Sequence, residues 1–184
     1  MSQPIYRKDN LRYLGQFEQT SNSMIISDPT FEDSGDSLFG ETFYLENVLP
    51  GLYDSWVVKS ELIYQNYSRL DNTYLLAIHY QYVTQTFDWK KITKVPVDTG
   101  QAGIYDSEYY CADDEKWYDM NSQIILTDLG AGVLPHGVVS HSGPGDGVYT
   151  AYAAYVNEKV IAVCINFEDD DDNTDDDTDE DDDN

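Results

Sequence analysis

The sequence is poor in basic residues. Its 184 residues include 10 Lys and Arg against 35 Asp and Glu, so the formal net charge is −25. Proteins that bind phosphates or anionic membrane surfaces use clusters of Lys and Arg, and no basic cluster is evident along the chain. We therefore expect neither direct nucleic-acid binding nor membrane binding.

Long hydrophobic runs and cysteines are also scarce. No stretch approaches the roughly 20 apolar residues of a membrane-spanning helix, and the N-terminus lacks the apolar run of a secretory signal. A soluble, cytoplasmic protein is the expectation. Cys111 and Cys164 have neither CxxC spacing nor histidines at zinc-finger distances, so we expect no disulfide and no zinc site. The apolar setting of Cys164 predicts a buried thiol.

The excess of acids is uneven along the chain. Residues 168–184 hold 13 acids and no base, which leaves 22 acids and 10 bases, or −12, to residues 1–167. The acidic segment has no apolar residue whose burial could offset the entropy of ordering. We predict one β-rich globular domain over 1–167 and a disordered acidic tail over 168–184.

Long helical periodicity is scarce too, whereas the 16 Tyr, 6 Phe and 3 Trp favour strands. We predict a mainly β fold, with α+β as the variant: an antiparallel β-sandwich or a strongly twisted sheet with one short helix. Thr73–Thr86 alternates best and predicts a central strand. Val148–Val156 and Lys159–Phe167 predict a closing hairpin, and Ile104–Asn121 is the helix candidate.

Shorter segments complete the expected architecture. Asp28-Pro29 and Pro50-Gly51 predict turns, Thr30–Gly40 predicts a loop, and Glu61–Arg69 fits either a strand extension or a connection. The shorter strands are predicted at Arg12–Phe17, Ser23–Ser27, Phe43–Leu49, Leu52–Ser60, Ile92–Val97, Ile124–Leu126 and Val133–Ser140.

The most distinctive motif is the loop before the closing hairpin, Ser142–Tyr149. Gly143, Gly145 and Gly147 permit backbone conformations that other residues resist, and Asp146 stands between two of them. Asp146 is either a ligand-binding or metal-binding carboxylate or an acceptor for the amides that begin the hairpin. A phosphate-binding loop is not expected, because a strand rather than a helix follows.

Asp98 and Asp106 flank a second glycine-containing loop. If both loops lie at one end of the sheet, Asp98, Asp106 and Asp146 would form a Ca²⁺ or Mg²⁺ site, or a carboxylate pair for acid–base chemistry. Asp98 before Thr-Gly is equally typical of a turn. His136 and His141 are five residues apart and would lie on opposite faces of a strand, and His79 lies within a predicted strand, so we interpret all three as ordinary core or surface residues.

Several motifs together resemble a mainly bacterial family of small β-rich domains of unknown function. The signature SG-x-GDG-x-Y-x-x-Y matches Ser142–Tyr152, and IAV-x-I-x-F matches Ile161–Phe167. Further matches are Asp28-Pro29, the turn at Pro50-Gly51, and Val97–Gly100 with Asp106.

The resemblance implies functional interest in five positions. These are Asp28, Asp98, Asp106, Asp146 and Tyr149; Asp28 is interpreted as a turn residue together with Pro29, as are Gly143, Gly145 and Gly147. Some related small acidic domains are suspected toxin-binding proteins, so the resemblance also implies an immunity-type role.

The charge favours a non-enzymatic protein that recruits a basic protein partner through its acidic domain and tail. Three alternatives stay open: a Ca²⁺-binding protein, a structural component of a larger assembly that uses the many tyrosines as contact surface, and a carboxylate-based hydrolase. No residue is assigned a catalytic role, and no cofactor other than Ca²⁺ is considered.

Overall fold

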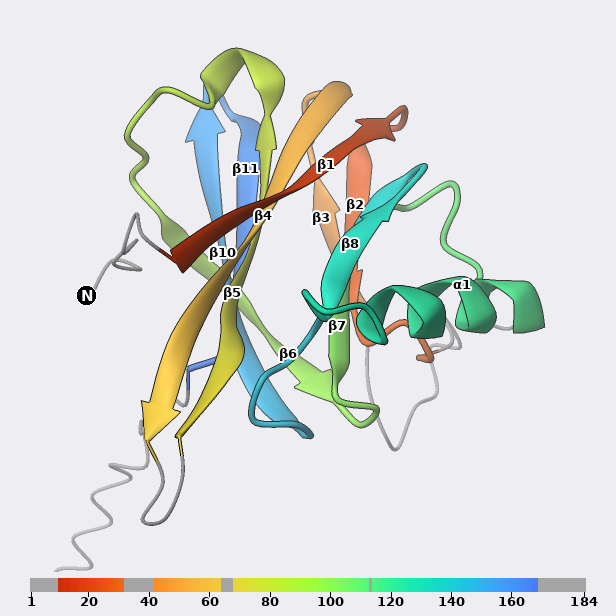
Figure 1. The fold of residues 1–184 in the computed structure, drawn as a ribbon. Coiled ribbons are helices and arrows are strands. Elements are labelled where there is room, and N and C mark those ends of the chain that lie inside the picture. Colours follow the sequence, from red (N-terminus) through yellow and green to blue (C-terminus); the bar gives the residue numbers. More distant parts are fainter. Residues whose placement is uncertain (1–9, 32–41, 64–67, 113, 169–184) are drawn as a thin grey trace, which may run out of the picture.

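The computed structural model describes residues 10–31, 42–63, 68–112 and 114–168 (Figure 1). Most of the predicted Thr30–Gly40 loop and all but the first residue of the acidic tail lie outside these residues. The elements are β1 (Leu11–Gln19), β2 (Ser23–Ser27), β3 (Phe43–Glu46), β4 (Gly51–Ile63), β5 (Ser68–His79), the 3₁₀ turn η2 (Tyr80–Tyr82), β6 (Lys90–Val97), β7 (Gln101–Asp106), α1 (Glu115–Ile125), β8 (Ala131–Leu134), β9 (Gly137–His141), β10 (Gly147–Val156) and β11 (Lys159–Asn166).

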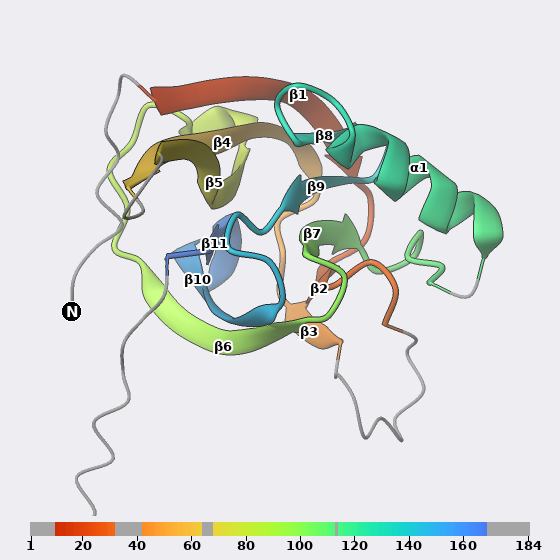
Figure 2. The same cartoon turned by 60° about the horizontal axis from the view of Figure 1, so that its bottom comes forward.

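The strands form two antiparallel sheets that face each other. The larger has the order β1-β4-β5-β11-β10-β6, and the smaller has the order β3-β2-β7-β9-β8. Edge strands β1 and β8 lie side by side, and the Glu18 amide donates to the Pro135 carbonyl at 3.0 Å. Viewed from one end, the two sheets surround a common interior (Figure 2). The fold is therefore mainly β, and the sandwich alternative is confirmed.

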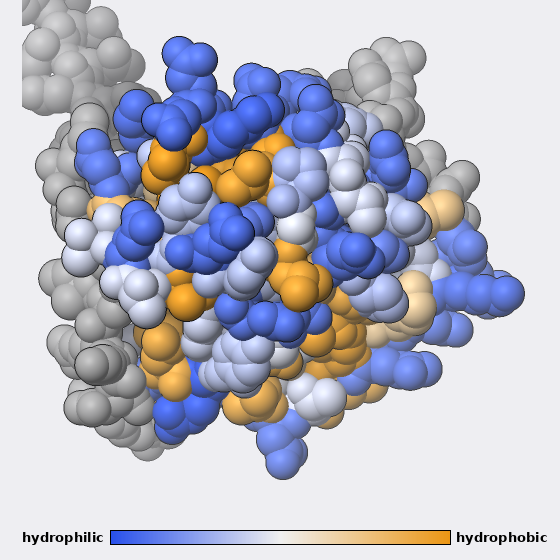
Figure 3. Space-filling view, turned by 90° about the horizontal axis from the view of Figure 1, so that it is seen from above, coloured by the Kyte–Doolittle hydropathy of each residue, from blue (hydrophilic) through white to orange (hydrophobic). Residues whose placement is uncertain are grey.

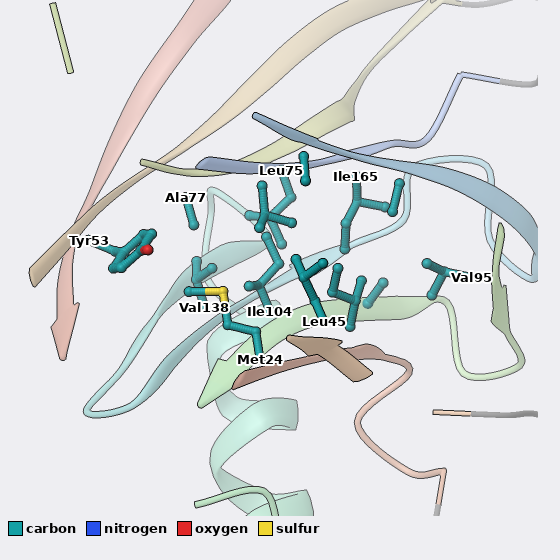
Figure 4. Close-up of a cluster of buried hydrophobic side chains, with 14 of the residues drawn as sticks. Met24, Leu45, Tyr53, Leu75, Ala77, Val95, Ile104, Val138 and Ile165 are labelled. Carbon is teal, nitrogen blue, oxygen red and sulfur yellow. The ribbon is translucent and has the colours of Figure 1, made fainter. Parts of the chain in front are cut away.

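Alternation along the strands builds the core between the sheets. Leu75 and Ala77 of β5 and Ile165 of β11 point inward from the larger sheet, and they meet Ile104 of β7 and Val138 of β9 from the smaller one (Figure 4). Each of these side chains is fully buried. Because strand residues alternate between faces, the intervening side chains lie on the two outer faces.

Helix α1 covers the outer face of the smaller sheet. Trp117 packs against Tyr105 of β7, and its indole N–H donates to the Pro29 carbonyl at 2.9 Å. The Tyr105 hydroxyl donates to Asn121 at 3.0 Å. These contacts bury one side of α1 and leave the other side exposed to solvent. Of the helices in the described part of the chain, none is long and apolar enough to cross a membrane.

A second apolar cluster lies on the outer face of the larger sheet. Leu76 of β5 and Cys164 of β11 are buried there, and Trp89, from the segment between η2 and β6, packs over them. The prediction that Cys164 is a small buried hydrophobe is confirmed. Burial raises the pKa of its thiol, so it remains protonated.

The closing hairpin is confirmed. β10 and β11 pair around Asn157 and Glu158, whose φ angles of 49° and 65° both lie in the left-handed region. That pair of conformations matches the right-handed twist of the flanking strands. The turn forms although neither residue is glycine.

Four predicted segments differ from the structure. Val133–Ser140, predicted as one strand, is divided by a turn at 135–136 into parts of β8 and β9, which pair with each other. The strand expected over Thr73–Thr86 is an interior strand, but it ends at His79, where the His79 side chain accepts from the Gln81 amide and begins η2. Ile104 lies in strand β7, and the helix begins nine residues after that strand, with Asp114 as its N-cap. Ile124 and Ile125 end the helix rather than form a strand, because their side chains pack on the smaller sheet.

Candidate functional site

Asp106, at the end of β7, is fully buried and accepts five hydrogen bonds. Oδ2 accepts from the amide and hydroxyl of Thr20 at 2.6 and 2.8 Å and from the Ser21 amide at 3.2 Å. Oδ1 accepts from the Ser21 hydroxyl at 2.6 Å and the Glu108 amide at 3.2 Å. Burial acts to raise the pKa of Asp106, but these donors outweigh it and lower the pKa. Asp106 thus holds the β1–β2 connection in place.

Asp28, directly after β2, is equally buried and has a similar set of donors. Oδ1 accepts from the amide and hydroxyl of Thr30 at 2.9 and 2.8 Å. Oδ2 accepts from the amides of Asp98 and Thr99 at 3.0 and 2.9 Å, and the Thr99 hydroxyl lies within 2.9 Å of both oxygens. The Asp28 carbonyl accepts from the Tyr110 hydroxyl at 2.9 Å.

Asp28 and Asp106 have equivalent roles at opposite ends of the β2–β7 strand pair. β2 and β7 are hydrogen-bonded neighbours. Asp28 follows β2 and binds the connection that leads into β7, whereas Asp106 ends β7 and binds the connection that leads into β2. Asp106 pairs with Met24, four residues before Asp28, so the two residues are about 14 Å apart at the usual rise per residue. Each carboxylate therefore stabilises a connection between strands, and the two carboxylates are too far apart to bind one ligand together.

The glycine-rich loop closes on its own backbone. The hydroxyls of Ser142 and Tyr149 both donate to the Gly145 carbonyl, at 2.5 and 2.7 Å. Gly143 has φ of 72°, and a Cβ there would overlap the carbonyl oxygen of Asn72 in β5. Only glycine satisfies both conditions. Tyr149 and Gly143 therefore have a structural role in packing the loop against the larger sheet.

The carboxylate of Asp146 takes no part in closing this loop. Asp146 is exposed, and within the described segments its carboxylate accepts no hydrogen bond, including none from the amides that begin β10. Gly147, next in sequence, is the first residue of β10 and pairs with Val97.

Asp98 and Asp146 lie at the same end of the sandwich, since Gly100 approaches Gly145. Both side chains are exposed there, whereas Asp106 lies at the other end of β7. The three carboxylates proposed for a Ca²⁺ or acid–base site do not converge. Over residues 10–31, 42–63, 68–112 and 114–168, no group of three or more His, Cys, Asp and Glu side chains is placed to hold a metal ion.

Five of the exposed acids in the described part of the chain lie on and around α1, and we call residues 107–128 the α1 segment. Lys116 is its single base. Apolar side chains accompany the acids: Tyr118 is 48% exposed, Met120 42% and Leu126 84%. The exposed acids of the segment are Glu108, Asp114, Glu115, Asp119 and Asp128. The sequence signal for this surface is the group of acids on both sides of Trp117, within the segment Ile104–Asn121 that we predicted to be helical.

A small group of bases lies on β6, an edge strand of the larger sheet. Lys90, Lys91 and Lys94 are all exposed, and Lys90 lies over the ring of Tyr155 at 5.4 Å. Lysines commonly protect sheet edges from pairing with other chains. β6 and α1 lie on opposite sides of the molecule (Figure 2), so the described surface has a basic strip and an acidic region well apart.

His79 is buried among aromatic rings. The rings of Tyr53, Tyr80 and Tyr82 lie 5.3, 5.0 and 5.7 Å from its imidazole. Nε2 lies 3.3 Å from the Pro50 carbonyl, and Nδ1 accepts from the Gln81 amide at 3.4 Å. Burial lowers the pKa of His79, opposed in part by the Pro50 carbonyl. These contacts suit the neutral imidazole and support its interpretation as a core residue.

Two antiparallel sheets and one helix define the chain as a β-sandwich protein. No family model, no curated protein and no solved structure matches it. The resemblance noted in the sequence therefore stays a prediction, and the function must be argued from the surface itself.

Proposed function

We propose that this protein is a non-enzymatic binding protein that recruits a basic protein partner through the α1 segment and the acidic tail. The observation that carries the proposal is the concentration of five exposed acids with a single base along the α1 segment. An acidic surface attracts cationic partners and speeds their association.

The apolar side chains of the α1 segment support the same proposal. Charged pairs at the rim of an interface mainly set specificity and association rate, while buried aromatic and aliphatic side chains supply most of the affinity. Tyr118, Met120 and Leu126 stand among the acids and are exposed. A partner that combines basic and apolar side chains fits this surface.

The other surfaces favour recruitment of a basic partner over a structural role in a larger assembly held by a broad apolar contact. The face in Figure 3 carries small hydrophobic patches separated by hydrophilic side chains. The buried Asp28 and Asp106 are occupied by internal donors, which argues against using them for hydrolysis. An intracellular location and an immunity-type role, in which the partner is a toxin, extend the proposal and rest on the sequence alone.

The experiment is affinity capture from cell extract with the full chain as bait, followed by identification of the bound proteins. We expect basic proteins that bind at about 0.1 M salt and are released at about 0.5 M, where the screening length falls well below 10 Å. A bait that lacks residues 168–184 separates the contribution of the tail. Capture of no basic protein in any condition would refute the proposal.

A matched pair of variants assigns the surface. Glu108→Gln, Asp119→Asn and Asp128→Asn together neutralise three acids of the α1 segment and spare the N-cap Asp114. The control neutralises three exposed acids elsewhere: Glu46→Gln, Asp88→Asn and Glu158→Gln. Both variants change the net charge equally, so only a surface-specific interaction distinguishes them.

A further inference from the structure

The tail leaves the sandwich on the outer face of the larger sheet. The Tyr74 hydroxyl donates to Glu168 at 2.6 Å, and the Glu168 amide donates to the Asn166 side chain at 2.8 Å. Tyr74 and Asn166 are cross-strand partners on β5 and β11. The first residue of the acidic tail is therefore fixed to this face.

The lysines of β6 share that face. Asn166 pairs with Thr150 of β10, and Thr150 pairs with Lys94. Val95, the next residue, points into the core, so Lys94 points to the outer face. Lys91 pairs with Tyr152, which packs on the outer cluster. Two strand spacings, about 10 Å, separate Asn166 from Lys94.

Neither lysine is neutralised by the sandwich. Within the described part of the chain, Lys91 and Lys94 form no ion pair, and both are exposed. The 16 residues after Glu168 contain 12 acids and no base. They can extend about 50 Å, so their first residues lie within reach of both lysines and within about one Debye length of Lys94.

We propose that the acidic tail folds back over the outer face of the larger sheet and pairs with Lys91 and Lys94. Three features favour the tail as the segment that binds these lysines: its length, its exit point at Glu168 and its complementary charge. Because the tail is tethered, its carboxylates act at a high effective concentration, which falls as the connecting chain lengthens. Lys116, on the opposite side of the molecule, is a poorer competitor for the tail.

The contact has a regulatory consequence, which rests on the proposed function. Carboxylates paired with β6 are withdrawn from a basic partner, so the partner must displace Lys91 and Lys94 to use the whole tail. The lysines would then weaken binding of weakly basic proteins and favour strongly basic ones.

The test is carbodiimide crosslinking of the full chain, which joins carboxylates to lysine amines only where they touch. Trypsin releases residues 160–184 as one peptide whose acids all lie in residues 168–184. We expect this peptide to be linked to Lys91 and Lys94 several-fold more often than to Lys116 or Lys159, and the links to decrease at about 0.5 M salt. Mixing labelled with unlabelled protein identifies links between molecules.

Equal linkage to all four lysines, or links only between molecules, would overturn the proposal. The regulatory consequence is measured with an oligolysine peptide as probe. Lys94→Gln should bind the probe several-fold more tightly than Lys159→Gln, which has the same net charge and lies outside both β6 and the α1 segment. Specific crosslinks without any oligolysine binding would refute the proposed function and leave the tail contact standing.

Discussion

Asp106 should be among the most sensitive polar positions in the chain. Asp106→Asn keeps the size of the side chain but places an amide group where Oδ2 now accepts from the Thr20 and Ser21 amides at 2.6 and 3.2 Å. Each buried donor left without an acceptor costs about 1–3 kcal/mol. Two such donors predict a loss of about 2–6 kcal/mol in the free energy of unfolding, measured by urea denaturation at neutral pH.

Acid dependence gives a second readout for Asp106. Because its folded pKa is lowered from 3.8, the carboxylate contributes stability that is complete above the unfolded pKa and is lost as the pH falls through the folded pKa. Asp106→Asn should therefore flatten the decline of stability below about pH 4. Asp98→Asn, at an exposed carboxylate, is the control. Equal unfolding free energies for the two variants would refute the structural role of Asp106.

Three further predictions concern the loop and the buried histidine. Gly143→Ala should lower the free energy of unfolding by about 3 kcal/mol or more, because the added Cβ overlaps Asn72. Gly145 has φ of 113° and open space around it, so Gly145→Ala should cost only the backbone strain of about 1–3 kcal/mol. Chemical denaturation measures both changes. Tyr149→Phe should lose about 1 kcal/mol, the value of the hydroxyl bond to Gly145, in the same assay. Since burial lowers the pKa of His79 below 6.5, stability should decline as the pH falls below about 6.5 toward the folded pKa, and His79→Gln should remove this part of the pH profile.

The alternation of side chains between the two faces predicted a strand well where the strands on both sides of it in the sheet alternate in the same way. β10 and β11 were located to within a residue because each faces the core on one side and the outer cluster on the other. The end of β5 could not be predicted, because Tyr80 and Tyr82 continue the alternation beyond His79. It is the imidazole contact with the Gln81 amide that starts η2 there, and such a contact has no signal in periodicity.

The candidate site was harder to predict, because its residues meet only through the topology. Asp28 and Asp106 each look like an acid beside a turn. Their roles depend on β2 and β7 becoming neighbours although 73 residues separate the two ends, Ser27 and Gln101, that lie near each other. The lysines of β6 are close together in the sequence, but their position beside the start of the tail could not be predicted, since only the pairing with β10 aligns Lys91 and Lys94 with it.

The capture experiment with the two charge-matched variants tests the central claim most directly. If the α1 segment recruits a basic partner, Glu108→Gln, Asp119→Asn and Asp128→Asn together should reduce the captured basic proteins several-fold. The control variant at Glu46, Asp88 and Glu158 should retain them. Equal loss in both variants would mean that net charge alone attracts these proteins, and capture unchanged in both would exclude the α1 segment as the binding surface.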